Sequence, residues 1–106
     1  MDKTLKYQQI ICDLLQEYAG IKKSLTPNVR SHLVLDKENR HYQLISMGWH
    51  GSKYIYTVAF HFSIMDGKVW IQQNNTDIMI ADELSERGIP SSDIILGFVP
   101  EKMRNI

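Results

Sequence analysis

Four histidines and one cysteine are the side chains in this sequence that could ligate a metal ion or take part in catalysis: His32, His41, His50, His61 and Cys12. Zinc sites usually show close ligand spacing, such as two histidines four residues apart on a helix or a CxxC pair. Here the histidines fall on three predicted strands and a turn, with no Cys or acidic residue at a motif distance. We therefore expect no metal site and no cofactor, although His41 and His61 could meet across neighbouring strands.

Cys12 could act as a nucleophile only with a base beside it. It lies off the main apolar face of its predicted helix, and no cysteine-enzyme motif surrounds it, which favours a semi-buried structural thiol. No GxSxG, P-loop or GxGxxG pattern occurs, and Asp36 and Asp66 have the positions of turn formers. We expect no catalytic residue and no enzyme activity.

Trp49 and Trp70, with five tyrosines, could stack on nucleic-acid bases. Such platforms are framed by Lys and Arg, because phosphate contacts dominate nucleic-acid affinity. This chain has twelve basic and twelve acidic residues, a formal net charge of zero, and its basic residues are scattered. The rings are therefore expected mainly in the core, and direct DNA binding is the weaker of two functional hypotheses.

The length of 106 residues, with 43% hydrophobic and 23% charged residues, predicts one globular domain over 1–106. No apolar run approaches the eighteen residues of a membrane span, and the first residues do not form a signal peptide. A single cysteine allows no internal disulfide. We expect a soluble cytoplasmic protein with no membrane association.

The hydrophobic periodicity predicts an α+β fold. Its elements are an N-terminal helix, a four-stranded antiparallel meander, a second helix and a short C-terminal segment. The first helix covers 3–19 and stops at Gly20, and a connector runs over 22–28. The strands cover 29–35, 41–49, 53–65 and 68–74, the second helix covers 77–87, and 91–98 forms either a short helix or a last strand.

Alternation along 53–65 places six apolar residues on one predicted core face: Tyr54, Tyr56, Val58, Phe60, Phe62 and Ile64. Asp66-Gly67 predicts a two-residue hairpin turn, which sets Ser63 opposite Trp70 and His61 opposite Gln72 on the second face. A two-residue turn within 50–52 adds Tyr42 and Leu44 to that second face, and an odd-length turn inverts this assignment. The candidate partner or oligomer surface is therefore Tyr42, Leu44, His61, Trp70 and Gln72. Alternatively, the C-terminal segment folds over this face.

Two stretches of the sequence together resemble the XisI family, and the similarity spans nearly the whole chain. The first comprises His41-Tyr42-Gln43-Leu44, Gly48-Trp49, Ile64 and Asp66-Gly67-Lys68-Val69-Trp70-Ile71-Gln72. The second comprises Ala81, Leu84, Gly88-Ile89-Pro90 and Asp93-Ile94-Ile95-Leu96-Gly97-Phe98. The resemblance implies a controlling factor for programmed excision of the fdxN DNA element during heterocyst differentiation in cyanobacteria. It also implies a companion protein, XisH, with DNA contacted indirectly through the excision machinery, and it assigns no catalytic residue.

Overall fold

A computed structural model of the protein describes residues 3–25 and 28–103 and confirms the α+β class. In chain order the elements are α1 (Lys3–Leu25), β1 (Val29–Asp36), β2 (His41–His50), β3 (Lys53–Met65), β4 (Lys68–Asn74), α2 (Ile80–Glu86), η1 (Ser91–Asp93), β5 (Ile94–Leu96) and η2 (Glu101–Met103). Within these ranges no helix is both long and apolar enough to cross a membrane.

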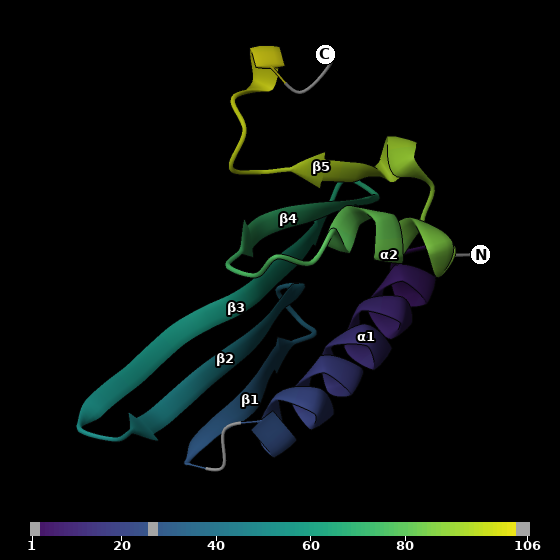
Figure 1. The fold of residues 1–106 in the computed structure, drawn as a ribbon. Coiled ribbons are helices and arrows are strands. Elements are labelled where there is room, and N and C mark those ends of the chain that lie inside the picture. Colours follow the sequence, from purple (N-terminus) through teal and green to yellow (C-terminus); the bar gives the residue numbers. More distant parts are fainter. Residues whose placement is uncertain (1–2, 26–27, 104–106) are drawn as a thin grey trace.

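The strands form one sheet in the order β1-β2-β3-β4-β5 (Figure 1). The first four are antiparallel, as the sequence predicts, and β5 adds a parallel edge strand with Val69 opposite Ile94. The predicted count of four strands was therefore one too low. The undecided segment 91–98 contains both a short 3₁₀ turn and this three-residue strand.

Helix α1 presents one apolar stripe to the sheet, formed by Tyr7, Ile11, Leu14 and Leu15, all of which are buried. The prediction that this helix stops at Gly20 was wrong, because the helix continues to Leu25. A glycine ends a helix when it adopts positive φ, and Gly20 is not among the positive-φ glycines. The predicted connector is correspondingly shorter, and residues 26 and 27 lie outside the described ranges.

Both α-helices cover the same face of the sheet, and α2 lies beside α1 (Figure 1). The Tyr18 hydroxyl donates to the Glu83 carboxylate, and the Arg87 guanidinium lies 2.6 Å from the Glu17 carboxylate. Arg87 also lies 4.0 Å from the carboxylate of Glu83, one helical turn earlier. The shared core then forms between these helices and the strands beneath them.

The turn at Asp66-Gly67 has positive φ at both residues, 54° and 74°, as a type I′ turn requires. It pairs Met65 with Lys68 and Ser63 with Trp70, which confirms the predicted register at this end. A bulge beyond Phe62 then sets His61 opposite Gln73 and not opposite Gln72. The register is therefore correct from the turn to Phe62 and shifted by one residue beyond it.

A second bulge, at Ala59, changes the face on which the two ends of β3 lie. Leu44 pairs with Phe60 and Ile45 pairs with Val58, so Ala59 has no opposite residue. An extra residue reverses the alternation of a strand. The predicted single face along 53–65 was therefore wrong. Phe60, Phe62 and Ile64 face the helices, whereas Tyr54, Tyr56 and Val58 face the other way.

Gly48 sits where β2 passes close to the start of β1. Its φ is 144°, and a Cβ built there would lie 2.1 Å from the Asn28 carbonyl oxygen. That oxygen accepts a hydrogen bond from the Trp49 N–H at 3.2 Å. The Gly-Trp pair noted in the sequence thus has a structural reason: only glycine permits this close approach.

A polar contact joins the first turn of α1 to the start of β5. The Tyr7 hydroxyl donates to Asp93 Oδ2 at 2.5 Å, and Lys3 Nζ lies 3.2 Å from the same oxygen. The hydrogen bond from Tyr7, and then that from Lys3, lowers the pKa of Asp93, while the same hydrogen bond raises the pKa of Tyr7 to about 12. This contact fixes the short edge strand to the helix layer.

We expect Asp93→Asn to lower the unfolding free energy by about 1 kcal/mol at pH 7, because a charge-assisted hydrogen bond is lost. The folded pKa of Asp93 lies below the unfolded value of 3.8. The difference between wild type and variant should therefore be nearly constant above about pH 5 and shrink as the pH falls below 3.8. Urea unfolding at several pH values measures this, and a difference that is undiminished at pH 2 would contradict it.

Candidate functional site

The face of the sheet opposite α1 and α2 is the candidate site, and we call it the open face. The register and the strand alternation place the following residues on it: Arg30, His32, Val34 and Asp36 of β1; His41, Gln43, Ile45, Met47 and Trp49 of β2; Tyr54, Tyr56, Val58, His61, Ser63 and Met65 of β3; Lys68, Trp70, Gln72 and Gln73 of β4; and Ile95 of β5. Ile45 and most other apolar residues of the open face do not belong to the core cluster that α1 and α2 cover.

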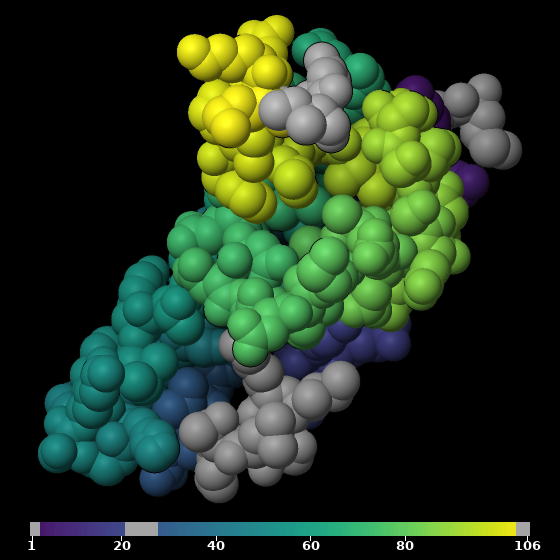
Figure 2. All heavy atoms as spheres, turned by 45° about the horizontal axis from the view of Figure 1, so that its top comes forward, coloured from purple at the N-terminus to yellow at the C-terminus, as the bar shows by residue number. Residues whose placement is uncertain are grey.

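Exposed aromatic rings gather at the end of the open face formed by the β2–β3 hairpin. Trp49 is 56% exposed, Tyr54 51% and Tyr56 62%, and the rings of Trp49 and Tyr54 meet edge-on with centroids 5.2 Å apart. The hairpin projects from the rest of the molecule (Figure 2, teal). Three large, exposed rings on one sheet face are unusual for a surface in contact with water alone.

Three of the five predicted surface residues, His61, Trp70 and Gln72, lie on the open face. The Gln72 amide donates to Ser63 Oγ at 3.0 Å, across neighbouring strands. Trp70, opposite Ser63, is half-buried. The predicted placement of these three residues on the second face is therefore confirmed, whereas their role as a partner or oligomer surface stays a prediction.

The other two predicted residues, Tyr42 and Leu44, were placed wrongly. Both are fully buried in the core under α1, where the Tyr42 hydroxyl donates to Gln8 Oε1 at 2.8 Å. The turn after β2 does have two residues, since His50 pairs with Lys53. The bulge at Ala59 nevertheless inverts the face assignment of β2, so Tyr42 and Leu44 face the helices while Met47 and Trp49 lie on the open face.

The exposed aromatic rings of the hairpin end are candidate functional residues that sequence reasoning missed. Tyr54 and Tyr56 were assigned to the core because β3 alternates without a visible break in residue type. The only local signal is Ala59, a small residue in a run of large ones. An alanine alone does not indicate a bulge, so the sequence offered no reliable sign.

His41 and His61 meet on the open face. Nδ1 of His41 lies 3.2 Å from Nε2 of His61, and the ring centroids are 5.4 Å apart. Burial, and then the charge of His41, lowers the pKa of His61. The sequence allowed these two rings to meet across neighbouring strands, and in the structure they do. No group of three or more His, Cys, Asp or Glu residues that could hold a metal ion occurs in the described ranges.

The described part of the C-terminal segment, up to residue 103, leaves the hairpin end of the open face uncovered. It joins the edge of the sheet as β5, where Gly97 donates its N–H to the Ile71 carbonyl and approaches the Gln72 side chain closely. Val34 remains 43% exposed, and the aromatic rings of the hairpin end are exposed as well. The alternative in which this segment folds over the second face is therefore wrong for the hairpin end and for Val34, whereas Gln72 and Trp70 lie directly beside β5.

Charges on the open face are few. Arg30 lies near one edge, opposite Met47, and Lys68 lies near the other, opposite Met65. Asp36, next to His41, accepts hydrogen bonds from Asn39, which lower the pKa of its carboxyl group. A face that is rich in aromatic rings and poor in charge has the composition of the core of a protein–protein interface.

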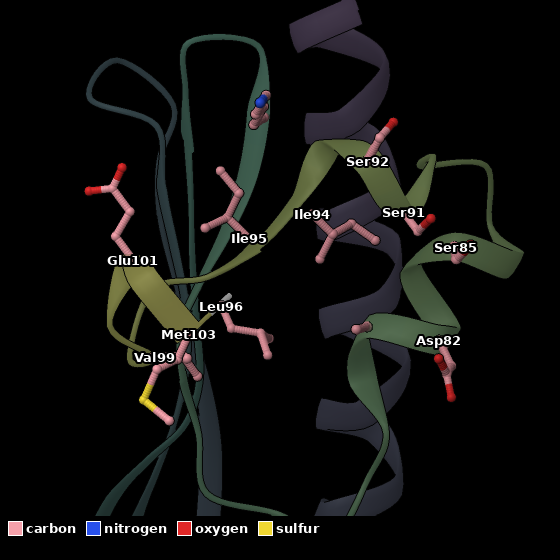
Figure 3. A pocket seen from close by; sticks show the side chains of 12 residues that line it. Asp82, Ser85, Ser91, Ser92, Ile94, Ile95, Leu96, Val99, Glu101 and Met103 are labelled. Atoms are coloured by element: carbon pink, nitrogen blue, oxygen red, sulfur yellow. The ribbon is translucent and has the colours of Figure 1, made fainter. Parts of the chain in front are cut away.

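A separate hollow of about 800 Å³ lies between α2, β5 and the C-terminal segment (Figures 2 and 3). Asp82 and Ser85 line one side, Glu101 and Met103 line the other, and the residues of β5 lie between them. Sequence reasoning did not predict this hollow. Its described lining contains serines but no histidine that could activate one as a nucleophile.

Cys12 is buried in the core, and this burial raises the pKa of its thiol. A raised pKa keeps the sulfur protonated at neutral pH and so lowers its reactivity. The structure therefore places Cys12 deeper than the semi-buried position predicted from the sequence.

Known proteins similar to this chain were found among families and solved structures. The family model for the XisI protein matches residues 1–106. The crystal structure of a XisI-like protein from Anabaena variabilis is 42% identical, with a TM-score of 0.89, covering 97% of this chain and 94% of that one. The crystal structure of fdxN element excision controlling factor XisI from the same organism is 31% identical, with a TM-score of 0.78, covering 95% and 98%. No curated protein matches the chain significantly.

Proposed function

The chain belongs to the XisI family, and from this we propose that it is an accessory factor that controls programmed excision of the fdxN DNA element. In this proposal it works in the cytoplasm during heterocyst differentiation and acts through contact with a XisH-like protein. A separate recombinase cuts and rejoins the DNA. The similar structure described as an fdxN element excision controlling factor supports this role.

The observation that carries the proposal is the open face with its exposed aromatic rings. A soluble accessory factor exerts control by binding, and binding energy concentrates on aromatic residues that become buried at the centre of an interface. Trp49, Tyr54 and Tyr56 supply such rings, and Trp70 lies further along the same face. The open face is thus the surface on which we place the XisH-like partner.

Direct DNA binding is the second candidate function, and the charges of this face favour it less. Arg30 and Lys68 lie near opposite edges of the sheet, and the whole chain is electrically neutral. Phosphate binding requires a continuous basic surface. A DNA contact made through the partner is consistent with this arrangement, and a contact made by the open face alone is not.

Size-exclusion chromatography with light scattering tests the proposal, using this protein alone, a XisH homologue from the same organism, and their mixture. We expect one co-eluting complex of defined mass. No complex at protein concentrations well above a micromolar affinity would overturn the partner assignment. The mass of the protein alone reports any homo-oligomer that competes for the same face.

A salt titration of binding to DNA from the element borders separates the two candidate functions. Direct binding through phosphates weakens steeply as salt rises, with a slope that counts the phosphate contacts. We expect no measurable affinity at physiological salt for this protein alone. Tight, salt-sensitive binding without the partner would favour the DNA-binding alternative.

A further inference from the structure

His41 and His61 come from neighbouring strands and point their ring nitrogens at each other on the open face. Their closest nitrogens, Nδ1 of His41 and Nε2 of His61, are 3.2 Å apart. His41 is exposed and His61 is half-buried. The pair therefore lies at the surface of the sheet and not in the core.

The distance between the two nitrogens fits a bound transition metal. Zn–N bonds of about 2.0–2.1 Å at a tetrahedral angle place two ligand nitrogens roughly 3.3–3.4 Å apart. An octahedral ion with similar bonds brings neighbouring ligands to about 2.8–3.0 Å. The observed 3.2 Å lies between the two ranges, so a small shift of the rings would let both nitrogens bind one ion in place of the direct hydrogen bond between them.

A further polar side chain, that of Gln43, lies beside the ring of His61. The Gln43 amide lies 3.5 Å from Nδ1 of His61. If Nε2 holds the metal, Nδ1 carries the proton, and the amide oxygen can accept it once the amide is turned.

We propose that His41 and His61 form a two-nitrogen chelate for a divalent transition-metal ion of the Zn²⁺ class on the open face. Imidazole nitrogens suit Zn²⁺, Ni²⁺ and Cu²⁺, whereas Mg²⁺ and Ca²⁺ prefer oxygen ligands. The remaining coordination positions belong to water, as in open zinc sites, or to the same pair in a second copy. The chelate does not depend on the XisH-like partner.

Isothermal titration of tag-free protein with zinc chloride tests the chelate, with magnesium chloride as the control ion. We expect zinc binding that falls at least tenfold in His41→Ala and in His61→Ala. The matched control is His32→Ala, since His32 is exposed on the same face, where it pairs with Ile45. That variant should bind zinc as the wild type does.

Nitrogen NMR of the imidazole rings gives a second readout. Zinc should shift Nδ1 of His41 and Nε2 of His61 in the wild type, while the ring signals of His32 and His50 stay in place. One ion per chain, or one ion per two chains in a dimer, would each support the chelate. Zinc affinity equal in the wild type and in the His41→Ala/His61→Ala double variant would overturn it, as would ring shifts confined to other histidines.

Discussion

Replacing Tyr42 by alanine is expected to lower the unfolding free energy by about 3–5 kcal/mol, the usual cost of removing a large buried ring. Tyr42 is fully buried beneath α1, and its hydroxyl donates to Gln8. The variant loses the packing of the ring and leaves the Gln8 amide oxygen without that donor. A domain of this size has a total stability of about 5–15 kcal/mol, so the urea midpoint should fall sharply.

Two matched variants show whether this cost comes from burial. Tyr42→Phe keeps the ring and loses only the hydrogen bond, at about 1 kcal/mol. Tyr56→Ala removes the same side chain from a site that is 62% exposed on the next strand, and should change stability by less than about 1 kcal/mol. Equal losses for Tyr42→Ala and Tyr56→Ala would mean that the two strand faces are assigned wrongly.

The comparison of Tyr42 with Tyr56 depends on one bulge, which is also where prediction from the sequence failed. Periodicity assigns a residue to a face by counting in twos, and one extra residue reverses every later assignment. The count started correctly at the Asp66-Gly67 turn and was valid for Phe60, Phe62 and Ile64. Beyond Ala59 it placed Tyr54 and Tyr56 on the wrong side, and with them Tyr42 and Leu44 of the partner strand.

Features with a strong local cause were predictable from the sequence. The stripe from Tyr7 to Tyr18 indicated α1, and the positive-φ pair Asp66-Gly67 fixed the hairpin that sets Trp70 opposite Ser63. Strand β5 was not predictable, because a strand of three residues is too short to show a hydrophobic periodicity. Its pairing with β4 is decided by tertiary contacts such as that of Asp93 with Tyr7. The hollow beside β5 was not predictable either, because it forms between segments that are far apart in the chain.

The last prediction concerns binding by the open face. Trp49→Ala is expected to weaken the complex with the XisH-like partner by about 30-fold or more, the effect of losing an aromatic hot spot of about 2 kcal/mol. Trp49 is 56% exposed and rests against Tyr54, so its removal should leave the fold intact. Trp70→Ala and His61→Ala should weaken the complex in the same direction, because both residues lie further along the face. Titration calorimetry of the purified proteins measures these affinities.

Leu5→Ala is the matched control, because Leu5 is 66% exposed but lies on α1, on the other side of the molecule. If exposed apolar area alone drove the association, this variant would weaken the complex too. If the open face is the docking surface, its affinity should equal that of the wild type while Trp49→Ala loses binding. The reverse result would place the partner on the helix layer and leave the aromatic hairpin free for another task. Because circular dichroism and the urea midpoint report folding separately, a loss of affinity in a fully folded Trp49→Ala variant can only come from the surface that the tryptophan occupied.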